Sequence, residues 1–108
     1  STGAKHVAKM LGVNGGLTAL NLSTNRLLDE GVSAVCEAIQ SNKETKLSSL
    51  NFKDNGIGPV GAKSVAAMVA VICTLTECNL RSNSSMGEEA QASIRNAVQG
   101  KAWFKLRL

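Results

Sequence analysis

The chain has 108 residues, of which 44% are hydrophobic and 19% charged, and it carries a net charge of +4. No apolar run approaches the roughly 18 residues that a membrane-spanning helix needs, so the composition is that of a globular domain without a membrane partner. Three cysteines without scaffold-like spacing, and no recognisable secretory signal, argue against a disulfide-rich secreted domain. We therefore expect an intracellular, cytoplasmic protein.

One nine-residue pattern recurs along the chain. Its first, fourth and sixth positions are apolar and its ninth is asparagine. Complete copies begin at Leu17, Leu47 and Leu75, and a fourth copy begins at Trp103, so the spacings are 30, 28 and 28 residues. Self-similarity at a period near 28 predicts a solenoid of stacked units.

Between these copies the residues predict helices. The spacing of Gly3, Val7 and Leu11 recurs later, at Gly31, Val35 and Ile39, so residues 3–12 read as the helix of a repeat that lacks its strand. Gly15 and Gly16 break this helix before the first complete strand. The next helix is expected near 29–41, with its apolar residues on one face.

The later crossings from strand to helix differ from each other. In the second repeat, glycines and Pro59 mark the crossing, with Pro59 placed just before the helix. The third repeat has a one-residue insertion at this point, and its apolar helix positions arrive one residue late. We expect Met86 to fill the place of the missing apolar residue there, and this crossing to be the least regular and most mobile.

The recurring pattern resembles the leucine-rich repeat, specifically its long ribonuclease-inhibitor-like subtype, over nearly the whole chain. The resemblance is carried by Leu17, Leu20, Leu22 and Asn25 and by their counterparts in the later copies. It implies an α/β solenoid with parallel strands on the concave side and helices on the convex side. We expect a single domain, residues 1–108, made of a partial repeat 1–16, repeats 17–46, 47–74 and 75–102, and a partial repeat 103–108.

Alternation along each strand separates an inward from an outward side. The inward positions predict the core: Leu20, Leu22, Leu50, Phe52, Cys78, Leu80, Leu106 and Leu108. The outward positions form three columns across the strands: Ala19, Ser49, Glu77 and Lys105; Asn21, Asn51, Asn79 and Arg107; Ser23, Lys53 and Arg81. The predicted partner-binding residues on this concave face are Asn21, Asn51, Lys53, Glu77, Asn79, Arg81, Lys105 and Arg107.

The concave face has two features that suggest a partner. Its asparagine column either grips a partner backbone or forms a hydrogen-bonded amide ladder that only solvates the sheet. Four basic residues stand against Glu77 alone, which would steer an acidic protein toward the face. Chance spacing on a solvated sheet is the alternative.

A second asparagine column lies where each strand ends, at Asn25, Asn55 and Asn83. A chain that leaves a sheet exposes backbone amide and carbonyl groups, which must be satisfied when they are buried. In leucine-rich repeats the matching asparagine turns inward and bonds neighbouring turns. We expect these three residues to be structural.

Signals for catalysis or metal binding are weak. The single histidine, His6, lies on the leading helix without a partner in a motif, which favours a solvated side chain. Cys73 and Cys78 suggest a metal pair only by proximity, and Cys78 occupies a leucine position, which favours a buried apolar role. We expect no enzyme, no metal and no cofactor.

The third helix is apolar on its expected outer side, at Ala67, Ala70 and Val71, where the second helix has Glu37 and Gln40. This pattern indicates either a lateral contact with another chain or a plain preference for alanine in helices.

The best-supported function is a non-catalytic protein-interaction module that uses the concave strand face and adjoining loops. The resemblance also implies an alternative, a regulatory subunit that modulates a small GTPase or a nuclease. Nucleic-acid binding is suggested by the pI of about 9.2 but opposed by the lack of surface aromatic residues. Neither end shows a polar cap, so we expect self-association through the ends.

Overall fold

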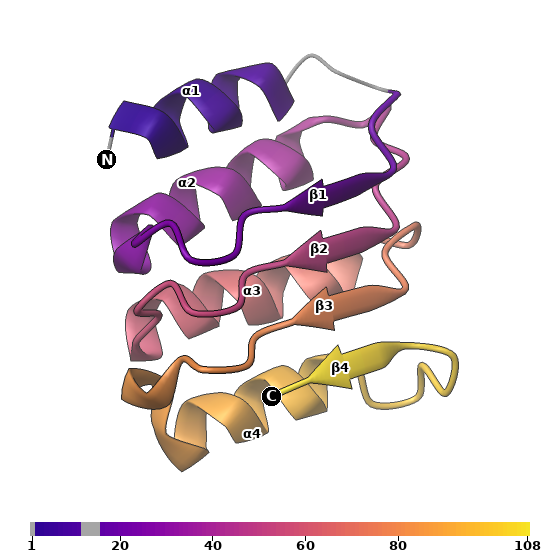
Figure 1. Cartoon of the computed structure of the whole chain (residues 1–108). Coiled ribbons are helices and arrows are strands. Elements are labelled where there is room, and N and C mark those ends of the chain that lie inside the picture. Colours follow the sequence, from indigo (N-terminus) through magenta and orange to yellow (C-terminus); the bar gives the residue numbers. More distant parts are fainter. Residues whose placement is uncertain (1, 12–15) are drawn as a thin grey trace.

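Each repeat folds into a short strand, a turn and a helix that runs back beside the sheet. The computed structural model describes residues 2–11 and 16–108. The elements in chain order are α1 (Thr2–Leu11), β1 (Ala19–Asn21), α2 (Leu28–Ser41), β2 (Ser49–Asn51), α3 (Pro59–Val71), β3 (Glu77–Asn79), the 3-10 helix η1 (Ser84–Met86), α4 (Gly87–Ala97) and β4 (Lys105–Arg107). The four strands form one layer and the α-helices form the other (Figure 1).

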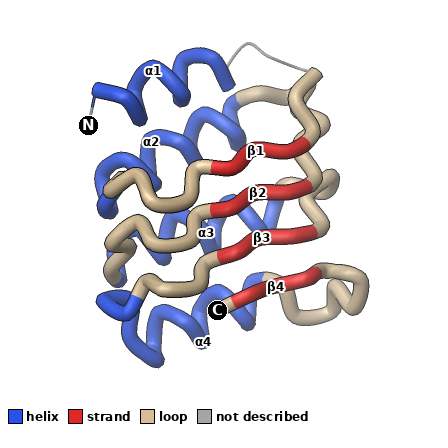
Figure 2. The backbone as a smooth tube through the Cα atoms, in the orientation of Figure 1, coloured by secondary structure: helices blue, strands red, loops and turns tan. Residues whose placement is uncertain are grey.

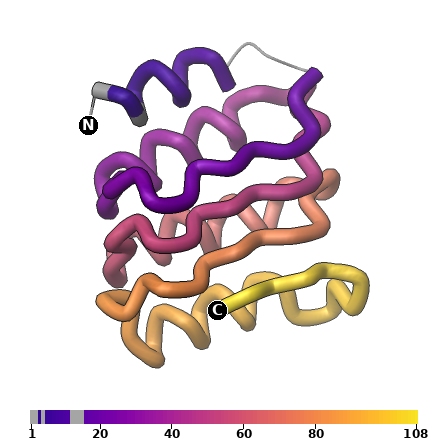
Figure 3. Tube along the Cα trace, viewed as in Figure 1, coloured from indigo at the N-terminus to yellow at the C-terminus, as the bar shows by residue number. Residues whose placement is uncertain are grey.

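The sheet is entirely parallel and its strands follow sequence order, β1-β2-β3-β4. Pairing continues beyond the short strands, since Leu22 N–H donates to Asn51 O at 2.9 Å and Phe52 N–H donates to Asn79 O at 2.8 Å. Consecutive coils therefore lie side by side at the strands, as the chain trace shows (Figure 3). The α/β solenoid expected from the repeats is confirmed.

The core lies between the sheet and the helices, and it is best covered at the two central strands, β2 and β3. Leu50, Phe52 and Cys78 are at most 1% exposed. Leu20 and Leu106, on the two outer strands, also face the core but are only half-buried. Each has a neighbouring strand on one side only, so part of its side chain stays uncovered. The sequence pattern therefore predicts the direction of these side chains but not their degree of burial.

The turns that leave the strands share one backbone conformation. Thr24, Asp54 and Ser82, at the eighth position of the pattern, have φ values of 58°, 56° and 62°. This left-handed conformation is uncommon for residues other than glycine, and an aspartate such as Asp54 tolerates it better than a β-branched residue such as Thr24. It turns the chain out of the sheet, through the loops drawn in tan, just before the ninth-position asparagine (Figure 2).

The start of α3 is held by the preceding repeat. Asp29, in the first turn of α2, accepts a hydrogen bond from Gly58 N–H at 2.6 Å. Gly61 lies so close that a Cβ atom there would be 2.6 Å from Asp29 Oδ1. Pro59 is the first residue of α3 and does not precede it, which corrects the sequence-based boundary by one position.

The third crossing has the irregular form that its insertion predicts. Residues Ser84–Met86 form the 3-10 helix, and Gly87 follows with a φ of 80°. Met86 is only 2% exposed, so it fills the core as expected. The expected mobility of this crossing stays a prediction.

The start of the chain agrees less closely with the sequence-based boundaries. The first helix ends at Leu11, and the expected helix residue 12 and the break at Gly15 lie outside the described residues. Among the described helices, none is long and apolar enough to cross a bilayer.

Candidate protein-binding face

The outward side of the sheet brings the predicted binding residues into straight columns. The strand register aligns Ala19, Ser49, Glu77 and Lys105 in one column, and Asn21, Asn51, Asn79 and Arg107 in the next. All eight outward side chains keep some exposure, whereas the central-strand residues that alternate with them, Leu50 and Cys78, are buried. We call this surface the strand face.

The asparagines of the strand face are oriented by their own strands. Asn21 Oδ1 accepts the N–H of Ser23 at 3.0 Å, and Asn51 and Asn79 accept the N–H groups of Lys53 and Arg81 at 2.9 and 3.0 Å. The amides do not bond one another within the described part of the chain, so of the two alternatives the amide ladder does not hold. Each side chain instead closes a local turn at the end of its strand.

The charges of the strand face are partly paired. Arg107 Nε donates to Glu77 Oε2 at 3.1 Å across β3 and β4, and Ser49 Oγ lies 3.5 Å from Glu77 Oε1. The single acid of the columns is therefore engaged. Lys53, Arg81 and Lys105 are exposed, and Glu77–Arg107 is the one ion pair among the described residues.

One charged residue beside the face was missed at the sequence level. Asp54 follows Lys53 at the left-handed turn position and is exposed. It reduces the positive charge at the rim of the face. Its place directly after an outward lysine, at a position that is Thr24 and Ser82 in the other repeats, was the signal available in the sequence.

The second asparagine column lies behind the strand face and is buried in two of its three members. Asn55 is 1% exposed and Asn83 5%. Asn55 Oδ1 accepts the N–H groups of Asn25 and Leu27, at 3.0 and 3.2 Å, and its Nδ2 donates to Leu22 O at 2.8 Å and Phe52 O at 3.0 Å. These bonds join two successive turns.

Asn83 makes the equivalent hydrogen bonds one repeat later. Its Oδ1 accepts the N–H groups of Asn55 and Ile57 at 2.9 and 3.0 Å. Asn25, by contrast, is exposed, and its Nδ2 bonds only carbonyls of its own turn, Leu22 O and Ser23 O. The inward position expected for all three residues therefore does not hold for Asn25, because the described residues include no earlier turn for it to bridge.

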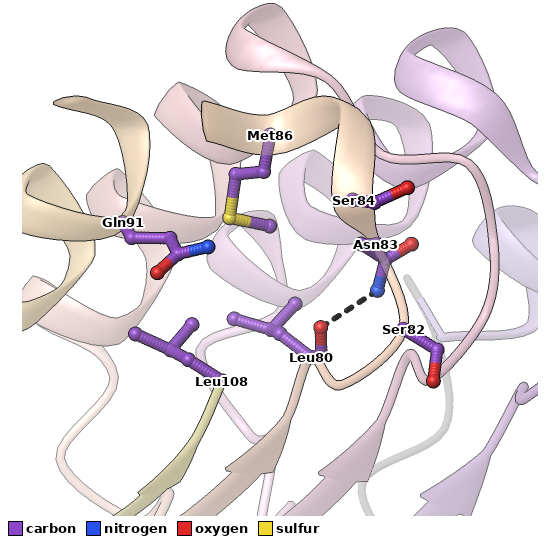
Figure 4. A pocket seen from close by; sticks show the side chains of 7 residues that line it. All are labelled: Leu80, Ser82, Asn83, Ser84, Met86, Gln91 and Leu108. Carbon is purple, nitrogen blue, oxygen red and sulfur yellow. Dashed lines mark hydrogen bonds between the residues drawn. The ribbon is translucent and has the colours of Figure 1, made fainter. Parts of the chain in front are cut away.

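A cavity of about 170 Å³ lies where this column ends, at the turn of the third repeat. Its walls include Leu80, Asn83, Met86, Gln91 and Leu108, and Figure 4 shows Asn83 donating from Nδ2 to the carbonyl of Leu80. A second cavity of about 390 Å³ lies between the starts of α3 and α4, with Lys63 and Glu88 on its walls. Neither cavity joins the residues of the strand face.

The residues considered for chemistry are dispersed. His6 is exposed on α1, Cys73 is exposed and Cys78 is buried, so the two cysteines do not form a pair. Among the described residues no group of three His, Cys, Asp or Glu side chains could hold a metal. Burial raises the pKa of Cys78 to about 12, with Glu77 adding to the shift, and burial also raises the pKa of Cys36.

The outer side of α3 has the apolar character that the sequence indicated. Ala67, Ala70 and Val71 are exposed, with Val71 at 59%. A lateral contact there stays a prediction.

The chain is similar in sequence to known proteins. The Leucine Rich repeat family pattern matches residues 17–36 and 43–66. Over 95 residues the chain is 34% identical to the ribonuclease inhibitor of Sus scrofa and 32% identical to that of Mus musculus. Each alignment covers 88% of this chain and 20% of the relative, so the chain spans about a fifth of the length of these proteins.

Solved structures share the fold at lower identity. Actin-Binding Site 2 of Leiomodin-1 superposes with a TM-score of 0.84 at 20% identity, over 98% of this chain and 61% of that one. The tropomodulin C-terminal domain of Caenorhabditis elegans superposes with a TM-score of 0.68 at 11% identity, over 97% of this chain and 81% of that one. At these identities the likeness concerns the fold alone.

Proposed function

We propose that this chain, a leucine-rich-repeat protein of the ribonuclease-inhibitor-like kind, is a protein-binding module without catalysis that engages its partner through the strand face. The observation that carries the proposal is the set of exposed cations Lys53, Arg81 and Lys105, which remains after Glu77 pairs with Arg107. A positive surface of this kind attracts a partner with an acidic surface.

The related proteins support binding as the general role. The sequence relatives are ribonuclease inhibitors, and one structural neighbour is named as an actin-binding site. Each of these names refers to a protein partner, ribonuclease in one case and actin in the other. For this chain the identity of the partner is part of the proposal, because the chain covers only a fifth of the inhibitors.

The size of the strand face limits its affinity. Four strands about 4.8 Å apart and about 10 Å long give only a few hundred Å². A stable interface buries roughly 800 Å² on each partner. The chain alone should bind weakly, and its affinity should fall as salt is raised.

The test compares two charge-reversed variants in capture from cell extracts at low salt. Lys53→Glu with Arg81→Glu changes the strand face. Lys43→Glu with Lys63→Glu changes two exposed lysines elsewhere by the same net charge. Proteins captured by the wild type should be retained by the second variant and reduced about tenfold or more by the first, which corresponds to ~1.4 kcal/mol or more. Equal capture by both variants would remove the strand face as the binding surface.

A second candidate is a regulatory subunit of a nuclease, favoured by the similarity to ribonuclease inhibitors. It predicts that the purified chain lowers the turnover of a ribonuclease in a dose-dependent way. Unchanged turnover at a large excess of the chain would leave plain binding as the function. Regulation of a small GTPase and self-association through the ends stay predictions.

A further inference from the structure

Three side-chain amides of the strand face have fixed directions and unused donors. The Oδ1 atoms of Asn21, Asn51 and Asn79 are each held by a backbone N–H two residues further on. Because the amide is planar, fixing Oδ1 also fixes the direction of Nδ2. None of the three Nδ2 groups donates a hydrogen bond within the described part of the chain. The face thus presents a row of oriented donors, one from each of β1, β2 and β3.

The surroundings of this row favour acceptors that carry negative charge. Lys53 and Arg81 are exposed two residues beyond Asn51 and Asn79, on the same side of their strands. A carboxylate can accept from a neutral N–H and pair with a cation at the same time. The negative charge of Asp54 at the rim repels an anion that lies beyond this row. A carboxylate of the partner is therefore directed toward the asparagines.

The spacing of the row distinguishes between partner conformations. The register places the three asparagines on adjacent strands, so the outer two are about 9.6 Å apart. Two turns of an α-helix rise about 10.8 Å. Four residues of an extended strand, the span of three side chains on one face, rise about 13.4 Å. A helix that crosses the strands matches the row within about 1 Å, whereas an extended peptide misses it by nearly 4 Å.

We propose that the strand face binds an acidic α-helix laid across β1, β2 and β3, with carboxylates one helical turn apart. These carboxylates accept hydrogen bonds from Nδ2 of Asn21, Asn51 and Asn79, and two of them pair with Lys53 and Arg81. This proposal deepens the proposed protein-binding function and rests on it. The helix of the partner ends before β4, because on β4 Arg107 replaces the asparagine and is already paired with Glu77.

A nucleic acid also carries regularly spaced anions, but the face lacks what binds its bases. Proteins that bind single strands stack the bases on aromatic side chains. The chain has three aromatic residues: Phe52 is buried, and Trp103 and Phe104 precede β4 in the return loop. Trp103 is exposed, so the expected lack of surface aromatic residues is wrong for this one residue. None of the three lies in the columns of the strand face.

The experiment uses two synthetic peptides of identical composition and net charge. One places glutamates at intervals of three and four residues, so that they share one helical face, and the other places them at alternate positions. The ¹⁵N-labelled chain is titrated with each peptide, and the side-chain amide resonances of Asn21, Asn51 and Asn79 are followed. The helical pattern should bind about tenfold tighter and shift these resonances. The bound peptide should also gain helical circular dichroism.

A pair of variants tests the donors themselves. Asn51→Asp with Asn79→Asp keeps an Oδ acceptor for the turn but replaces both donor groups with carboxylate oxygens. Asn96→Asp with Gln99→Glu makes the same charge change at exposed positions at the end of α4 and just beyond it. The first variant should lose at least about tenfold in affinity for the helical peptide and the second should lose little.

Several results would overturn the helix proposal. These are equal or tighter binding of the alternating peptide, no binding of either peptide, unchanged binding by the Asn51→Asp, Asn79→Asp variant, or tighter binding of a single-stranded oligonucleotide of equal charge. The capture experiment with the Lys53→Glu, Arg81→Glu variant is independent of peptide conformation. If capture depends on the strand face and the peptides show no preference, the binding function holds and the helical partner does not.

Discussion

Two columns of asparagine run across the same three repeats, one on the strands and the other four residues later in the turns. The protein uses the two columns differently. Asn55, in the turn column, is buried, and its side chain makes five hydrogen bonds, three to the preceding repeat and two within its own turn. Asn51, in the strand-face column, is half-buried and bonds one N–H of its own turn. Asparagine therefore stabilises the fold in the turn column, where the protein supplies every hydrogen-bond partner. In the strand-face column its donors remain unused, so it is available for binding.

The largest expected effect comes from removing the central turn asparagine. Asn55→Ala leaves the N–H groups of Asn25 and Leu27 without their acceptor, whereas Leu22 O and Phe52 O still accept from Asn25 and Asn83. Each buried unsatisfied group costs about 1–3 kcal/mol, and partial relaxation lowers the sum, so we expect a loss of about 3–5 kcal/mol in unfolding free energy. Urea denaturation followed by circular dichroism measures it.

Asn25→Ala is the matched control within the same column. Asn25 is exposed and its side chain bonds only two carbonyls of its own turn, so its loss should be under about 1 kcal/mol. Equal losses for the two variants would show that the bridge between turns contributes nothing special to stability.

An intermediate effect concerns the thiol on the inward side of β3. The pKa of Cys78 is raised by burial to about 12 in the folded protein, from an ordinary value of 9.0. Above pH 9 the unfolded chain ionises first, so stability is complete below pH 9 and falls as pH rises toward 12. The loss from this one thiol should reach about 2–3 kcal/mol by pH 11.

Denaturation measured at pH 8, 9.5 and 11 tests this dependence. Cys78→Ala should show a shallower loss of stability with pH, although Cys36 still contributes in the same direction. Cys73→Ala, at an exposed position, should retain the wild-type slope. A Cys78→Ala slope identical to that of the wild type would mean that this thiol ionises without unfolding the chain.

The smallest expected effect is on the strand face. Asn51→Ala removes one exposed bond to Lys53 N–H, which water can replace, so unfolding free energy should change by less than about 0.5 kcal/mol. Binding of the acidic helical peptide should nevertheless weaken. A stability loss comparable to that of Asn55→Ala would erase the distinction between the two columns.

Much of the architecture could be predicted from the sequence because the repeat fixes it. A period near 28 residues places equivalent positions on adjacent strands, and strand alternation then assigns Leu50 and Phe52 inward and Asn51 outward. The alignment of Asn21, Asn51 and Asn79 follows from the same periodicity. These features depend only on residue spacing and apolar pattern, which the sequence contains.

The tertiary structure decided how each polar group is satisfied. The pairing of Arg107 with Glu77, the support of Gly58 by Asp29 and the turn closed by Asn51 depend on backbone angles and on atoms of neighbouring repeats. Burial also depends on those neighbours, which is why Asn55 and Asn83 are enclosed and Asn25 is exposed. A hydrogen bond forms only within about 3.2 Å and at a favourable angle, so residue spacing alone does not determine its partner.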